Sequence, residues 1–148
     1  MRGYRFLEHT ADVGLEASGE TLDEAFANAA AGLFALIAEG PVTPTEEVRV
    51  KVTATDLEEL LVHWLNELLY LYDTEGLLFS RFRVHIFLGE KTGPPSFKLE
   101  AQVFGEKADP AKHTRMREVK AATYHGLQLQ QRALGGTGRY LLRVVFDV

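Results

Sequence analysis

Residues 57–73 read LEELLVHWLNELLYLYD, and their apolar residues recur every three or four positions. This spacing places them on one face of an α-helix. The face is wide and consists of Leu57, Leu60, Leu61, Trp64, Leu65, Leu68 and Leu71. Asp56 and Glu59 provide the acidic start signals of such a helix. The segment therefore predicts a buried helix that runs from Asp56 to about residue 73.

A second helix is predicted nearer the N-terminus. Thr21 and Glu24 have the spacing of a capping box, in which a hydroxyl and a carboxylate satisfy the first free N–H groups of a helix. Apolar residues then recur at helical spacing to about residue 38, where Gly40-Pro41 gives a stop signal.

The remaining segments have strand patterns, separated by glycine- and proline-rich breaks. They lie at 4–8, 13–18, 48–52, 77–88, 96–104, 122–132 and 139–147. Together the pattern predicts an α+β fold, a two-layer sandwich in which two helices pack on a largely antiparallel β-sheet. At this length we expect a single domain over residues 1–148.

Composition excludes several classes of function. The absence of cysteine removes thiolate zinc sites, thiol nucleophiles and disulfides. A formal net charge of −5 argues against broad, phosphate-driven binding of nucleic acid. No apolar run is long enough to span a membrane, and the N-terminus does not resemble a signal peptide, so we expect a cytoplasmic protein.

Familiar catalytic motifs are absent from the sequence, and we assign no catalytic residue. Gly135-Gly136-Thr137-Gly138 falls between two predicted strands and not before a helix, which favours a hairpin loop over a phosphate-binding loop.

Acidic residues give the first candidates for chemistry. Asp12 lies in the segment His9-Thr10-Ala11-Asp12-Val13-Gly14, which fits a tight turn but would also suit an oxygen ligand with His9 beside it. The last apolar strand runs straight into Asp147 and the terminal carboxylate of Val148. Two adjacent anionic groups repel each other unless water or a cation screens them. A solvated strand end and a metal site both remain open on these residues alone.

A third candidate lies in residues 118–127, where strand alternation separates the side chain of Lys120 from its apolar neighbours. Lys120 fits a solvated strand residue, and it would equally suit a charge that balances carboxylates or contacts a phosphate.

Taken in order, these segments resemble the archease family over the whole chain. The matching blocks are residues 9–14, 19–26, 60–70, 105–106, 118–125 and 144–148. The resemblance implies an accessory protein of the RtcB-type tRNA-splicing and RNA-repair ligase, which promotes guanylylation and multiple turnover of that enzyme. It implies contact with RNA only through the ligase.

The resemblance also implies a divalent-metal site at Asp12, Asp147 and Val148, with Lys120 and His9 as further functional residues. Hard oxygen ligands suit calcium, and also magnesium or manganese, better than zinc or copper. One alternative is a small metal-dependent phosphoester hydrolase, for which His9 or His125 would have to serve as the base. Another is a binding module without metal, which should expose an apolar patch.

Overall fold

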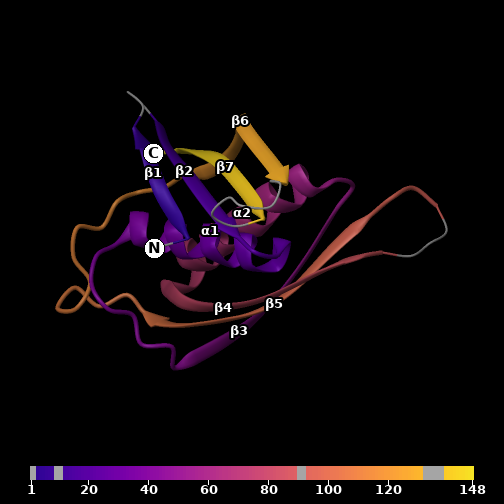
Figure 1. The fold of residues 1–148 in the computed structure, drawn as a ribbon. Coiled ribbons are helices and arrows are strands. Elements are labelled where there is room, and N and C mark those ends of the chain that lie inside the picture. The colour runs from indigo at the N-terminus through magenta and orange to yellow at the C-terminus, as the bar shows by residue number, and fades with distance from the viewer. Residues whose placement is uncertain (1–2, 9–11, 90–92, 132–138) are drawn as a thin grey trace.

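The structure is a computed structural model that describes residues 3–8, 12–89, 93–131 and 139–148. Within these residues the chain forms seven strands and two helices (Figure 1). Their bounds are β1 Tyr4–Glu8, β2 Asp12–Gly19, α1 Leu22–Ile37, β3 Glu46–Ala54, α2 Leu57–Glu75, β4 Leu77–Leu88, β5 Phe97–Lys107, β6 Ala121–Gln131 and β7 Tyr140–Asp147. Every helix and strand predicted from the sequence is present, with ends that differ by a few residues.

The strands form two antiparallel sheets with the helices between them (Figure 1). The larger sheet has the order β1-β2-β7-β6, and the smaller has the order β3-β5-β4. Helix α1 contacts β2 and β4, and α2 contacts β6 and β3, so each helix touches both sheets. The predicted α+β class, with two helices and antiparallel strands, is confirmed. The strands divide into two sheets on opposite sides of the helices, where the sequence pattern suggested one.

Both helices begin at the predicted capping residues. The Thr21 hydroxyl accepts a hydrogen bond from the Glu24 N–H at 3.1 Å, and the Asp56 carboxylate accepts one from the Glu59 N–H at 2.8 Å. Glu59 in turn accepts from the Thr55 N–H at 3.0 Å. Helix α2 ends at Gly76, whose φ of 69° lies in the left-handed region that favours glycine.

The core lies between the sheets and is built around the two helices. Trp64 of α2 is fully buried, and its indole N–H donates to the Phe26 carbonyl of α1 at 3.0 Å. Phe34 of α1 packs edge-on against Phe79 of β4. Burying each large apolar side chain contributes roughly 1.5–3 kcal/mol, so this layer holds both sheets in place.

No helix in the described part of the chain is long and apolar enough to cross a membrane.

Candidate functional site

The first residue of β2 and the last residue of β7 lie directly opposite each other at one end of the larger sheet. Asp12 pairs with Asp147 in the antiparallel register, and Ala121, the first residue of β6, pairs with Asp147 on its other side. Residues directly opposite in an antiparallel pair direct their side chains to the same face. The structure therefore brings together two carboxylates that are separated by almost the whole chain.

Both carboxylates belong to the outer face of this sheet. Leu15 and Ala17 of β2, and Val144 and Phe146 of β7, are buried against the helices. Because side chains alternate between faces along a strand, Asp12 and Asp147 face away from the core. Asp147 is exposed, and Asp12 is half-buried.

Lys120 and the chain end complete this end of the sheet. The Lys120 N–H donates to the Asp147 carbonyl at 2.8 Å, so the backbone of Lys120 lies beside the acidic pair. Val148, which is 38% exposed, follows Asp147 directly. Four of the five predicted site residues thus lie at one place, and the fifth, His9, lies outside the described residues.

In the described part of the chain, the acidic pair has no ion-pair partner to balance its charges. Within the described residues, no Lys or Arg forms an ion pair with Asp12 or Asp147. Glu16, on the same face of β2, accepts from Arg143 at 2.8 Å and from Arg5 at 2.9 Å. Hydrogen bonding from Arg143, and more weakly from Arg5, holds the pKa of the Glu16 carboxyl below its ordinary value, although burial partly opposes this effect.

A metal ion would find oxygen ligands here but no complete side-chain set. Among the described residues, no three His, Cys, Asp or Glu side chains form a group that could hold a metal. Asp12 and Asp147 supply two carboxylates. This donor set fits a hard cation such as calcium, magnesium or manganese, which also accepts water as a ligand.

Asn66 of α2 holds the strand beside the acidic pair, and this role was not identified from the sequence. Its side-chain amide donates to the Ala122 carbonyl at 3.3 Å and accepts from the Ala122 N–H at 2.8 Å. The helix thus satisfies both backbone groups of a strand residue that is next to Ala121. A polar residue between Leu65 and Leu68, within the apolar pattern of the helix, was the signal that could have identified it.

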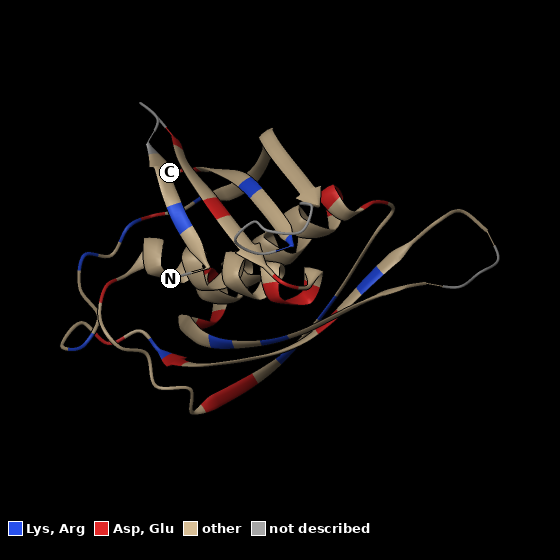
Figure 2. Ribbon diagram, in the orientation of Figure 1, with Lys and Arg blue, Asp and Glu red and all other residues tan. Residues whose placement is uncertain are grey.

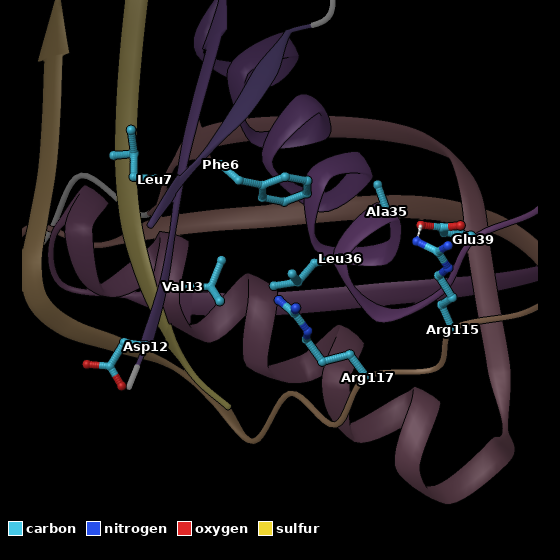
Figure 3. Close-up of a pocket in the computed structure, with 9 residues that line it drawn as sticks. All are labelled: Phe6, Leu7, Asp12, Val13, Ala35, Leu36, Glu39, Arg115 and Arg117. Atoms are coloured by element: carbon cyan, nitrogen blue, oxygen red, sulfur yellow. Dashed lines mark ion pairs between the residues drawn. The ribbon is translucent and has the colours of Figure 1, made fainter. Parts of the chain in front are cut away.

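A hollow of about 550 Å³ lies next to Asp12, between β1, β2 and the end of α1 (Figure 3). Phe6, Val13 and Leu36 line its apolar part, and Arg115 and Arg117 bring positive charge to it. Arg115 also pairs with Glu39 at 3.6 Å. The two arginines were not identified from sequence, because the segment before β6 had no secondary-structure pattern.

The Gly105-Glu106 block has a structural explanation, whereas the predicted loop Gly135–Gly138 cannot be checked in this structure. The Glu106 carboxylate accepts hydrogen bonds from the Lys112 ammonium and from the Thr43 N–H, both at 2.7 Å. These bonds hold the segments around Thr43 and Lys112 against the end of β5. Gly105 beside it lies where any side chain would overlap the Leu78 carbonyl of β4. The predicted hairpin loop Gly135–Gly138 lies outside the described residues.

A family profile and individual related sequences point to the same family for this chain. Residues 4–148 match the profile of the Archease protein family (MTH1598/TM1083). Proteins named archease from Sulfurisphaera tokodaii and Pyrococcus abyssi are 42% and 41% identical to the chain over 149 aligned positions, with 100% of each chain covered. An archease from Methanosarcina mazei is 40% identical, over 98% of this chain and 95% of the relative.

Comparison with solved structures agrees. The solution structure of Methanobacterium thermoautotrophicum protein 1598 superposes with a TM-score of 0.78 and 33% sequence identity, covering 100% of both chains. The two-sheet arrangement is therefore shared by a relative of similar length.

Proposed function

Because this chain belongs to the archease family, we propose that it is an accessory protein of an RtcB-type RNA ligase that promotes guanylylation and multiple turnover of that enzyme. In this role it would act in tRNA splicing and RNA repair in the cytoplasm. The chain would not itself catalyse the joining of RNA ends.

One observation carries this proposal: Asp12 and Asp147 lie directly opposite each other, at the start of β2 and the end of β7. Like charges side by side are unfavourable unless a cation or solvent screens them. Since no Lys or Arg of the described residues pairs with them, the arrangement favours a function that uses the negative charge.

We propose that the Asp12 and Asp147 carboxylates and the terminal carboxylate of Val148 hold a divalent cation, calcium in the first instance and magnesium or manganese as alternatives. When bound, such an ion supplies a concentrated positive charge that can attract phosphate oxygens. The chain's own groups orient it: the β2–β7 ladder sets the spacing of the two carboxylates, and Asn66 holds the start of β6 beside them. Lys120 would add a second positive charge at the edge of the site.

The test is RNA ligation under multiple-turnover conditions by a cognate RtcB-type ligase with GTP and manganese. We expect the wild-type chain to stimulate turnover, and Asp12→Ala and Asp147→Ala to lose most of that stimulation. Asp73→Ala is the matched control, because Asp73 is an exposed carboxylate of α2 outside the site.

Absence of stimulation by the wild type with an active ligase would reject the accessory role. If Asp73→Ala lost as much stimulation as the site variants, the acidic pair would have no special part in the activity. Hydrolysis of phosphoesters by the isolated chain, lost in Asp12→Ala, would instead support the hydrolase alternative.

A further inference from the structure

The smaller sheet presents an open face on the side away from the helices. Val50 of β3, and Leu99, Ala101 and Val103 of β5, are buried against the core. Because side chains alternate along a strand, the residues adjacent to these buried positions, and those paired with them on β4, face outward. The register sets these outward residues in four rows across β3, β5 and β4: Glu47–Phe104–Arg81, Arg49–Gln102–Arg83, Lys51–Glu100–His85 and Thr53–Lys98–Phe87. We call this surface the basic sheet face.

Its charge is opposite to that of the whole chain. It carries the basic residues Arg49, Lys51, Arg81, Arg83 and Lys98 and the acidic residues Glu47 and Glu100. Figure 2 shows the basic residues as blue segments along β3, β4 and β5. The face has an excess of three positive charges, although the chain has a net charge of −5. Among the described residues, one ion pair lies within it, between Arg49 and Glu47 at 3.5 Å.

Planar groups are interleaved with these charges. The guanidinium carbons of Arg81 and Arg83 lie 5.6 and 5.7 Å from the centre of the Phe104 ring. Across the last two rows, His85 stacks on Phe87 with ring centres 5.3 Å apart and an angle of 29° between the planes. Stacking holds the guanidinium groups against the sheet and limits their rotation, so less entropy is lost when they bind.

The centre of the face is also concave. A hollow of about 660 Å³ is lined by outward residues of all three strands, among them Arg49, Lys51, Arg83, His85, Glu100 and Gln102. The Gln102 amide can donate and accept hydrogen bonds at the middle of this hollow. The hollow therefore holds positive charge, a polar amide and the planar groups of Arg83 and His85, and the other planar groups of the face lie outside it.

We propose that the basic sheet face binds single-stranded nucleic acid. Lysine and arginine would contact the phosphates, and unpaired bases would stack on the guanidinium planes and on the His85–Phe87 pair. An extended acidic peptide would match the charge but would not use the planar groups, and a duplex would hide its bases from them. This inference goes beyond the accessory role and does not rest on it, since the chain alone should bind.

The experiment measures anisotropy of a short fluorescent oligouridylate titrated with the isolated chain. We expect binding that weakens with salt, with a slope of log K against log salt that is about 0.7 for each phosphate contact. The double variant Arg81→Gln/Arg83→Gln should bind at least about tenfold more weakly and lose roughly 1.4 from that slope. Phe104→Leu should weaken binding with a smaller change in slope, because it removes a ring and no charge.

The matched control is Arg5→Gln/Arg139→Gln, which removes one charge from β1 and one from the residue just before β7 and should bind as the wild type does. Circular dichroism melts establish that every variant is folded. The proposal would be overturned by no binding by the folded wild type, by equal weakening in the control, or by equal affinity for polyglutamate. A duplex that binds as tightly as the single strand would also reject it, because stacking on unpaired bases would then have no part.

Discussion

Glu16 and Asp12 lie on the same strand and the same face of the larger sheet, but among the described residues arginine pairs with Glu16 and not with Asp12. Arg5 and Arg143 approach it from the neighbouring strands β1 and β7, and its side chain is 12% exposed. These partners give Glu16 a structural role and distinguish it from the acidic pair at the end of the sheet. The sequence shows three acidic residues here without this difference, because the difference depends on cross-strand partners.

The Glu16 ion pairs predict a specific dependence of stability on pH. Because hydrogen bonding from Arg143 lowers the pKa of Glu16, the folded state favours the charged carboxyl. Its stabilising contribution is therefore present above the ordinary pKa of 4.5 and is lost as the pH falls through the lowered value. The free energy of unfolding of the wild type should fall below pH 4.5 more steeply than that of Glu16→Gln.

Urea unfolding at a series of acidic pH values measures this difference. Carboxyl titration by NMR gives a direct check, since Arg143→Gln should raise the pKa of Glu16. A constant difference between wild type and Glu16→Gln across the acid range would show that the ion pairs contribute nothing that titrates.

Single residues of the site could be predicted, but their arrangement could not. Asp12, Asp147 and Lys120 were identifiable because they lie in short segments that resemble a family. Their closeness follows from a ladder that joins the two ends of the chain, and neither periodicity nor spacing encodes which strands pair. Arg117 had no such signal and was found only because the chain before β6 returns beside α1, where its N–H donates to the Ile37 carbonyl at 2.7 Å.

At the level of helices and strands, capping chemistry made the sequence informative. Both helices begin at the residues whose side chains accept the first free N–H groups, so local hydrogen bonding alone defines these ends. The burial of α1 is a different case. Ala25, Phe26, Ala29, Ala30, Leu33 and Phe34 are all buried, which covers more than one face. A helix that is apolar on several sides must pack against other elements on several sides. This feature of α1 was the signal for a second sheet.

The Asn66 side-chain amide links α2 to β6 through two hydrogen bonds with Ala122. Replacing Asn66 by leucine would leave the N–H and C=O of Ala122 without their partner, and Ala122 is only 5% exposed. An unsatisfied buried polar group costs about 1–3 kcal/mol, so Asn66→Leu should lower the free energy of unfolding by about that amount. Gln130→Leu is the control, since Gln130 is an exposed residue of β6, the strand that contains Ala122.

Urea unfolding compares the two variants, and amide exchange at Ala122 reports on the joint itself. Equal stability of Asn66→Leu and Gln130→Leu, with unchanged exchange at Ala122, would show that β6 is held by its ladder with β7 alone.

Across the whole molecule, charge is segregated in a way that the net value hides. The acidic pair lies at the end of the larger sheet, and the basic sheet face lies on the other side of the helices (Figure 2). A charge of −5 correctly describes the total, but a partner meets one surface at a time. This segregation could not be predicted before the strands were assigned to two sheets, because the register decides which side chains share a face.

Metal binding at the acidic pair should stabilise the entire fold. A ligand that binds only the folded state adds about 2.7 kcal/mol when its concentration is a hundredfold above its dissociation constant. Calcium should therefore raise the melting temperature of the wild type, and a chelator should reverse the rise. Asp12→Asn should abolish the shift, and a glycine appended after Val148 should reduce it, because the appended residue moves the terminal carboxylate away from Asp147.

Asp73→Asn controls for the loss of one negative charge, since Asp73 is exposed and remote in sequence from both ends of the ladder. It should retain the full calcium shift. If the shift survived in Asp12→Asn, the ion would bind elsewhere, and if it survived the appended glycine alone, two carboxylates and water would suffice.

Because β2 and β7 are neighbours in the larger sheet, an ion between Asp12 and Asp147 would join the first part of the chain to its last strand. Its stabilising effect should then extend to the unfolding of the whole chain, and a single melting transition should move.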